Sequence, residues 1–215
     1  MVNKICYIIG AGDNHGLDFV VTDGDYVIAA DGGLASLQAC GVDPDLVIGD
    51  FDSLGYTPLH HNVISLSCNK DHTDTFEAIQ AGIAKGYKTF HIYGGTGGRF
   101  DHTYANIQTL AYLSQMGNAG YLVGKDYVIT AITNGGISFP ACCDGYVSVF
   151  AYSNEADWVS IQGLKYELDN HRLTSTMPMG VSNEFVGVES VIAVVDGTLI
   201  IVFPREYLNS MMRAE

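Results

Sequence analysis

The sequence predicts an α/β domain followed by an all-β domain. In the first half, short apolar runs alternate with segments whose apolar residues recur at helical spacing, a pattern typical of a mainly parallel sheet covered by helices. After about residue 125, short runs follow one another with turn signals between them, which is typical of a β-sandwich or barrel. We therefore expect an N-terminal α/β domain over residues 1–128, with a mainly parallel sheet, and a C-terminal β-sandwich over residues 129–215.

The strands expected in the first half are continuous apolar runs rather than alternating ones. Such runs suit strands that are buried on both faces of a parallel sheet. Each run ends at a glycine, an aspartate or a serine that would begin a loop. The expected strands are Ile5–Ile9, Tyr26–Ala30, Leu46–Ile48, Val63–Leu66 and Thr89–Tyr93.

Two segments between and after these runs have apolar residues three or four positions apart, which places them on one helical face. The first covers residues 73–84, where Thr73 is a candidate N-cap and Gly86 suits the position just beyond the helix. The second covers residues 101–116 and ends before Gly117. Strands alternating with helices in this way favour an α/β domain.

The second half is expected to contain strands alone. Turn signals separate several of its apolar runs: Asn134-Gly135-Gly136, Asp144-Gly145 and Asp196-Gly197. The last pair, between two apolar runs, is a strong hairpin signal. The expected strands are Tyr127–Ile132, Ile137–Phe139, Tyr146–Ala151, Val159–Gln162, Arg172–Thr174, Glu184–Val186, Val188–Val194 and Leu199–Phe203.

The composition excludes several classes of protein. Of the 215 residues, 47% are hydrophobic and 16% are charged, so the chain can bury a core without disulfides or a structural metal. The formal net charge is −14, which argues against a nucleic-acid-binding protein because there is no basic stripe to neutralise phosphates. No apolar stretch approaches the roughly 18 residues that a membrane span needs.

The five cysteines form no C-x-x-C pair. An odd count without that spacing is a poor disulfide framework and suits a reducing cytosol. The apolar run near the N-terminus is followed by glycines and an aspartate, so we interpret it as a first strand and not as a signal peptide. We expect a cytoplasmic protein that binds neither membranes nor nucleic acids.

Two aspartates, Asp50 and Asp52, follow a buried strand at Leu46–Ile48. Ligands of open α/β sheets bind beyond the carboxyl ends of the strands, where these side chains would lie. Neighbouring carboxylates repel each other unless a cation offsets their charge, and Mg²⁺ does so with carboxylate, water and phosphate oxygens. The motif alone is also compatible with a polar turn in which the aspartates cap the backbone.

A second cluster, Lys70-Asp71-His72-Thr73-Asp74, opens the first expected helix. Capping accounts for Asp74, because the positive end of the helix dipole favours an acidic residue there. It requires neither Lys70 nor Asp71, and a lysine at such a turn can bind phosphate as a mobile point charge.

The third cluster runs from Gly94 to His102 and contains four glycines and Arg99. It joins a strand to a helix, where exposed backbone N–H groups and the helix dipole favour phosphate, and an arginine can grip phosphate oxygens with two hydrogen bonds. It matches neither of the usual nucleotide-binding fingerprints. We interpret the earlier loop at residues 10–16 first as a turn and second as a phosphate loop.

The histidines and serines indicate no further chemistry. The pair His60-His61 lies in a loop without a third ligand at zinc spacing. No serine lies in a nucleophile elbow, so a hydrolase triad is not supported.

Taken together, the clusters resemble the thiamine pyrophosphokinase family in its bacterial form. Each motif is short, but six of them in the expected order, from about residue 27 to about residue 202, are highly specific. The matching segments are Ala29–Gly33, Pro44–Ser53, Lys70–Asp74, Gly94–His102, Gly163–Tyr166 and Gly180–Glu184.

The resemblance implies that the chain transfers a pyrophosphoryl group from ATP to thiamine, giving thiamine diphosphate and AMP. It implies Mg²⁺ and a homodimer with sites shared between subunits, an ATP- and Mg²⁺-binding domain over residues 1–128 and a thiamine-binding domain over residues 129–215. Asp50, Asp52 and Asp74 would hold the metal, and these three would act in catalysis with Asp71 and Arg99. The ATP-binding residues would be Asp31, Lys70, Thr73, Gly94, Gly95, Arg99, Asp101 and His102, and the thiamine-binding residues would be Tyr166, Ser182 and Asn183.

Two other functions remain open from the residues. A phosphatase of the haloacid-dehalogenase type also places D-x-D after a buried strand, although its first motif normally lies near the chain start and the second half here lacks a late acidic pair. A non-catalytic nucleotide-sensing module would use the same phosphate contacts, although three acidic clusters at one site exceed what binding requires.

Overall fold

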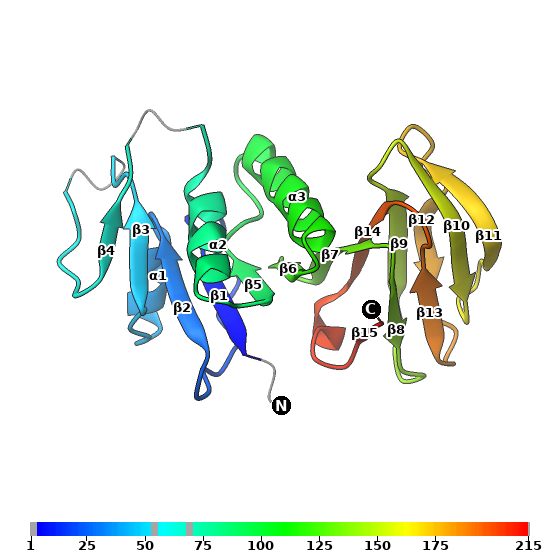
Figure 1. Ribbon diagram of the computed structural model, residues 1–215. Helices are drawn as coiled ribbons and strands as arrows, with labels where there is room; N and C mark the ends of the chain where they lie inside the picture. The colour runs from blue at the N-terminus through cyan, green and yellow to red at the C-terminus, as the bar shows by residue number, and fades with distance from the viewer. Residues whose placement is uncertain (1–3, 53–55, 68–70, 215) are drawn as a thin grey trace. The chain divides into compact units, whose positions relative to one another are not determined.

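The computed structural model describes residues 4–52, 56–67 and 71–214 (Figure 1). The chain divides into two compact units. The first comprises Met1–Thr109 and Leu122–Gly124, and the second comprises Leu110–Tyr121 and Lys125–Glu215. Each unit has its own core.

The first unit is built on a parallel sheet with the strand order β5-β1-β2-β3-β4. Its inner strands are buried along nearly their whole length, as expected of a sheet covered on both faces. The strands are β1 (Ile5–Ile9), β2 (Tyr26–Ala30), β3 (Leu46–Gly49), β4 (Val63–Ser65) and β5 (Thr89–Tyr93).

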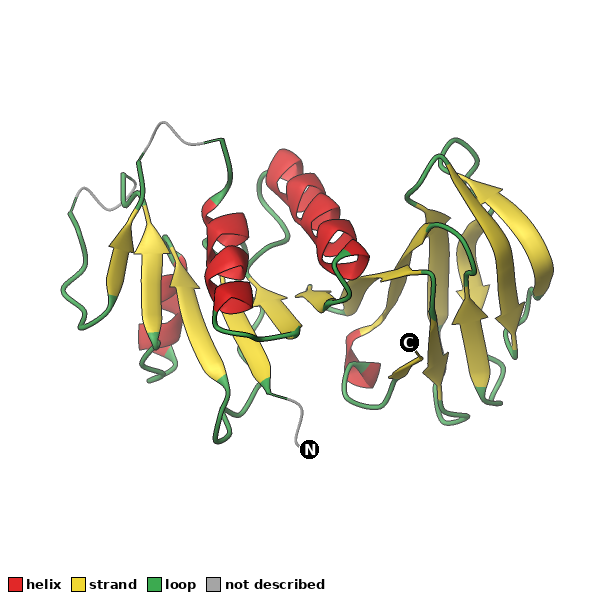
Figure 2. Cartoon of the chain, in the orientation of Figure 1, coloured by secondary structure: helices red, strands yellow, loops and turns green. Residues whose placement is uncertain are grey.

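Two helices cover opposite faces of this sheet (Figure 2). Helix α1 (Gly33–Ala39) packs against β1 and β2, and α2 (Asp74–Ala84) packs against β1, β2 and β3. Helix α3 (Phe100–Gln115) follows β5, begins in the first unit and ends in the second. Because the strands are parallel, the loops after β1, β2, β3 and β5 gather at one edge of the sheet.

The second unit is a β-sandwich. One sheet has the order β12-β9-β14-β7 and the other the order β11-β10-β13-β8-β15, with antiparallel neighbours. Phe139 on β8 packs edge-on against Phe203 on β14, which joins the two sheets in one core. The elements from the boundary onward are β6 (Ala119–Val123), β7 (Tyr127–Thr133), β8 (Gly136–Phe139), β9 (Tyr146–Ala151), β10 (Glu155–Gln162), β11 (Leu168–Thr174), β12 (Gly180–Glu184), β13 (Ser190–Ala193), β14 (Thr198–Pro204), a 3₁₀ turn (Arg205–Tyr207) and β15 (Met212–Ala214).

The structure confirms the fold class predicted from the sequence. Between residues 135 and 204, all of which are described, every regular element is a strand. One expected strand was misplaced: β12 ends at Glu184, whereas the sequence suggested Glu184–Val186. Beyond it, Phe185 forms an isolated bridge to Leu164 and donates its N–H to the carbonyl of Gly145 at 3.1 Å, and the left-handed Gly187 (φ 77°) turns the chain.

Four elements of the described chain escaped the sequence analysis: α1, β6, the 3₁₀ turn and β15. Helix α1 has seven residues, begins with glycine and has no side-chain cap, so it lacks the usual start signals. No helix in the described part of the chain is long and apolar enough to cross a membrane.

Candidate active site

A pocket of about 660 Å³ lies in the first unit, at the edge where the parallel strands end. Its walls come from the loops after β1, β2, β3 and β5 and from the first turns of α2 and α3. The volume falls within the roughly 300–1,000 Å³ of small-molecule sites. The sheet topology therefore brings together four loops that are far apart in the sequence.

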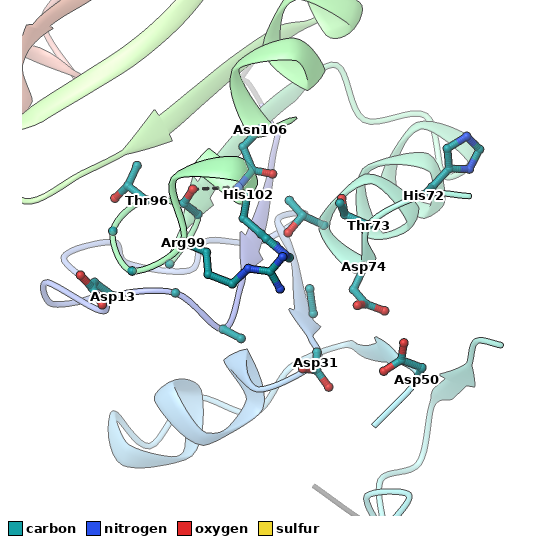
Figure 3. Close-up of a pocket in the computed structure, with 18 of the residues that line it drawn as sticks. Asp13, Asp31, Asp50, His72, Thr73, Asp74, Thr96, Arg99, His102 and Asn106 are labelled. Carbon is teal, nitrogen blue, oxygen red and sulfur yellow. Dashed lines mark hydrogen bonds between the residues drawn. The ribbon is translucent and has the colours of Figure 1, made fainter. Parts of the chain in front are cut away.

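Among the described residues, five aspartates line this pocket: Asp13 after β1, Asp31 after β2, Asp50 after β3, Asp71 just before α2 and Asp74 at its start. Figure 3 shows Asp50 and Asp74 pointing toward one another, with Asp31 beside them. Asp31 has a left-handed backbone (φ 49°) that is held by a hydrogen bond of 2.8 Å from its N–H to the carbonyl of Ile48. The neighbouring strands β2 and β3 thus fix two acidic side chains close together.

The start of α2 contributes a second group of polar side chains. Thr73 is the N-cap, and its hydroxyl accepts a hydrogen bond from the N–H of Phe76 at 3.2 Å. Asp71, Thr73 and Asp74 all line the pocket. The positive end of the helix dipole is therefore directed at the pocket. There it would stabilise a bound anion, or a carboxylate that in turn holds a cation.

The glycine loop after β5 is tied to the loop after β1. The N–H of Gly12 donates to the carbonyl of Gly94 at 2.7 Å, and the N–H of Asp13 donates to the carbonyl of Thr96 at 3.1 Å. A side chain at Gly94 (φ 61°) would overlap the carbonyl oxygen of Gly10, so this approach requires glycine. The loop at residues 10–16, which the sequence suggested to be first a turn, also lines the pocket through its first residues.

Asn106 was missed by the sequence analysis, although it lines the pocket. It is 4% exposed, and its amide donates a hydrogen bond of 2.8 Å to the carbonyl of Gly95 (Figure 3). Asn106 follows His102 by four positions on α3, so the two share a face of that helix. This spacing was the signal available in the sequence.

Arg99 and Asp101 form a two-pronged ion pair at the rim of the pocket. The guanidinium of Arg99 donates from Nε at 3.2 Å and from an Nη atom at 2.5 Å. These hydrogen bonds lower the pKa of Asp101 and raise that of Arg99. Both side chains are largely exposed, so the guanidinium can exchange this carboxylate for a phosphate of similar geometry.

The second unit holds the other predicted binding residues, which lie on or near the edge strand β12. Asn183 is 4% exposed. Its Oδ1 accepts from the N–H groups of Tyr166 and Glu184, both at 2.9 Å, and its Nδ2 donates to the carbonyl of Tyr166 at 2.7 Å. Asn183 therefore holds the main chain of Tyr166, whose own side chain is 60% exposed. Ser182 is exposed and has a left-handed backbone (φ 55°).

Two domain models of a single family match the chain, one on each side of the predicted boundary. Residues 18–120 match "Thiamin pyrophosphokinase, catalytic domain", and residues 137–199 match "Thiamin pyrophosphokinase, vitamin B1 binding domain". The chain belongs to the thiamine pyrophosphokinase family. The pocket just described lies within the part that matches the catalytic model, apart from the loop after β1.

Individual thiamine pyrophosphokinases support this assignment. The chain is 27% identical over 184 residues to the thiamine pyrophosphokinase of Bacillus subtilis (strain 168), covering 81% of this chain and 85% of that protein. It superposes on a crystal structure of the Bacillus subtilis enzyme with a TM-score of 0.83 at 25% identity, covering 94% and 99% of the two chains. The Candida albicans enzyme shares the fold, with a TM-score of 0.73 at 16% identity and coverage of 94% and 89%.

The pocket of this thiamine pyrophosphokinase family member contains most, but not all, of the residues predicted from the sequence. The predicted residues that line it are Asp31, Asp50, Asp71, Thr73, Asp74, Gly94, Gly95, Arg99 and His102. Asp52 and Asp101 are exposed and lie outside the lining, and the N–H of Asp52 makes a long hydrogen bond of 3.4 Å to Asp50. Lys70 lies outside the described residues.

Most of the groups that could hold a metal in this pocket are oxygens. Asp31, Asp50 and Asp74 supply carboxylates from three elements, and the threonine hydroxyls and loop carbonyls add neutral oxygens. No cysteine lines the pocket, and His72 and His102 are its only imidazole groups within the described chain. An oxygen-rich donor set suits a hard cation such as Mg²⁺, which keeps several waters and uses one or two carboxylates.

Proposed function

We propose that this protein transfers a diphosphoryl group from ATP to the hydroxyethyl oxygen of thiamine. A single observation carries the proposal: one pocket joins acidic side chains to a glycine loop and a helix N-terminus, in a chain whose two parts match the catalytic and vitamin B1 binding models. We assign ATP and metal binding to residues 1–128 and thiamine binding to residues 129–215.

In this reaction the hydroxyl oxygen of thiamine forms a bond to the β-phosphorus of ATP. The bond from that phosphorus to the oxygen bridging it to the α-phosphorus breaks, and AMP leaves with the electron pair. The hydroxyl proton passes to a base, which we assign to one of the pocket carboxylates. Such a reaction depends on positioning and on offsetting phosphate charge more than on a covalent protein nucleophile.

The pocket residues have distinct roles in the proposal. The glycine loop and the first turn of α2 would bind phosphate oxygens through backbone N–H groups, with His102 beside them. Arg99 would exchange Asp101 for phosphate, and Lys70 would add a positive charge. When Mg²⁺ is bound, it would offset the phosphate charge, and Asp50 and Asp74 would hold it. Asp52 would join them if the exposed loop turns inward.

Thiamine would meet the exposed groups of the second unit. The ring of Tyr166 is 60% exposed and would stack on thiamine, with the ammonium of Lys165 5.5 Å from its centroid. Ser182 is exposed on β12. Asn183 would act through Tyr166, because its amide groups are engaged with that residue's main chain. We further propose a cytoplasmic homodimer in which each second unit covers the partner's pocket; the free thiols of Cys6, Cys40, Cys142 and Cys143 are consistent with a reducing compartment.

Product analysis tests the reaction. Purified protein is incubated with ATP, Mg²⁺ and thiamine, and AMP, ADP, phosphate and thiamine diphosphate are separated by ion-exchange chromatography. Equal amounts of AMP and thiamine diphosphate are expected. Thiamine-independent phosphate release would favour a phosphatase, and nucleotide binding without turnover would favour a sensing module.

Variants test the site. Asp50→Asn and Asp74→Asn are expected to lower kcat by about 100-fold or more, because each removes a charge that stabilises the transferring group. Asp23→Asn is the matched control, since Asp23 is an exposed aspartate of the same unit outside the pocket. Normal turnover in both pocket variants would contradict the assignment.

Subunit mixing tests the shared site. Asp50→Asn and Tyr166→Ala chains should each be inactive alone. After mixing and re-association they should recover at most about a quarter of wild-type activity, because half the dimers are mixed and each has one intact site. No recovery despite verified exchange would mean that one chain builds the whole site.

A further inference from the structure

Three side chains able to bind a metal meet at the edge of the first unit's sheet opposite the pocket. They are Asp43, His60 and His61, and their ligand atoms all lie within 4.8 Å of one another. Asp43 precedes β3, and the histidines precede β4, which runs parallel to β3. Figure 1 shows β3 and β4 running in the same direction. The cluster therefore lies at the amino ends of these strands, whereas the pocket lies at the carboxyl ends.

His60 is already oriented as a metal ligand would be. Its side chain is only 9% exposed, and its Nε2 is buried with no hydrogen-bond partner among the described residues. A buried polar atom without a partner is destabilising. Its Nδ1 lies 3.0 Å from the carbonyl oxygen of Asn62. The N–H of Asn62 also lies 3.2 Å from Nδ1, so the two contacts fit different tautomers of the ring. In the tautomer whose Nδ1–H donates to the carbonyl, Nε2 keeps its lone pair, which is the usual arrangement of a ligating histidine.

The distances suit a small divalent cation. Nε2 of His60 is 3.5 Å from Oδ1 of Asp43, which is long for a hydrogen bond. It is close to the ~3.4 Å that separates two ligands of a tetrahedral zinc ion at about 2.0–2.1 Å each. His61 and Asp43 are exposed, so their side chains can close the remaining distance by rotation.

The backbone on both sides of the cluster is held in place. The side-chain amide of Asn62 donates to the carbonyl of Asp45 at 2.7 Å, and the N–H of Val47 donates to the carbonyl of Asn62 at 3.0 Å. The carboxylate of Asp45 in turn accepts from the N–H of Val27 at 2.8 Å. These bonds fix the turn before β3 against the loop before β4, so the ligands are presented by a rigid frame.

We propose that Asp43, His60 and His61 bind a divalent transition-metal cation, with Zn²⁺ the best fit, and that this site is separate from the catalytic pocket. Two imidazoles and one carboxylate form a set that binds zinc and leaves a position for water, whereas Mg²⁺ prefers oxygen ligands. The metal fastens the edge strand β4 to β3. It stabilises the first unit and takes no part in the transfer reaction.

Metal binding by the full chain tests the proposal. Chelator-treated protein is titrated with Co²⁺ in the presence of excess Mg²⁺, and the visible absorption of Co²⁺ reports imidazole ligation. Zn²⁺ is then used to displace it, and bound metal is counted after dialysis. One equivalent per chain is expected. His61→Ala and Asp43→Asn should each weaken binding by at least about tenfold, since loss of outer-shell partners alone has effects of that size.

Exposed residues elsewhere supply the controls. His15→Ala and His171→Ala remove exposed imidazoles outside the cluster and should leave Co²⁺ affinity unchanged. Zn²⁺ should raise the Tm of the wild type but not of His61→Ala. The test does not rely on His60→Ala, because that substitution removes a buried ring. Absence of stoichiometric binding, or equal affinity in wild type, His61→Ala and Asp43→Asn, would overturn the proposal.

Discussion

The hydrogen bond from Asn106 to the glycine loop offers a quantitative test of how the pocket is held. Asn106→Ala removes the donor that satisfies the carbonyl of Gly95, and both residues are buried. A buried carbonyl that loses its partner costs about 1–3 kcal/mol. We expect the free energy of unfolding to fall by that amount in urea titrations. If ATP binding must restore the loop conformation at the same free-energy cost, the Kd of ATP rises by about 5- to 150-fold.

Two further variants separate this hydrogen bond from other effects of the substitution. Asn106→Asp keeps the shape but places a carboxylate oxygen against the carbonyl, so its ATP affinity should fall at least as far. Gln108→Ala removes an exposed amide from the same helix and should change neither quantity. Unfolding by urea and ATP binding by calorimetry provide the measurements. An Asn106→Ala protein with wild-type stability and wild-type ATP affinity would refute the reasoning.

Two predictions concern the rest of the first unit. Burial lowers the pKa of His91 from 6.5 to about 4, although the negative charges of Asp25 and Asp18 act in the opposite direction. The folded state therefore holds this ring neutral, and the stability that depends on its neutral form is present above about pH 6.5 and is lost as the pH falls toward 4. Urea unfolding should show a loss of about 1 kcal/mol between pH 7.5 and 5.5 that His91→Gln lacks, and equal pH profiles would contradict this. Gly33→Ala should destabilise the protein by about 1–3 kcal/mol, because the added Cβ would overlap the carbonyl oxygen of Ile9; an unchanged Tm would show that α1 can shift to admit it.

The fold class and the acidic and glycine-rich clusters that line the pocket could be predicted because their signals are local. Continuous apolar runs are produced by burial on both faces of a parallel sheet. The strand predicted on that basis at Leu46–Ile48 is found at Leu46–Gly49. Thr73 was correctly expected to cap α2, since capping depends on residues three positions apart. The family resemblance rested on short motifs of the same kind, and two domain models confirm it.

Residues whose roles depend on distant partners could not be predicted in this way. Asn106 reaches Gly95 across a loop, and Asn183 reaches back to the main chain of Tyr166. The contact of Asn183 leaves no pattern in the neighbouring sequence, and Asn106 is marked only by its spacing of four positions from His102. Asp52 shows the opposite case. Asp50 and Asp52 form a clear motif in the sequence, but only the carboxylate of Asp50 lines the pocket.

The sequence by itself determined that this chain has an α/β half and a β half, where the acidic and glycine-rich clusters lie, and to which family it belongs. These properties follow from hydrophobic periodicity and from residues a few positions apart. Only the tertiary structure decided which clusters meet. The parallel register of β1, β2, β3 and β5 brings four loops to one pocket, and the pairing of β3 with β4 brings Asp43 to His60 and His61. Strand order is decided by packing across the whole sheet. The pair His60-His61 has no third ligand at zinc spacing in the sequence, but the fold places Asp43 beside it from the turn before β3.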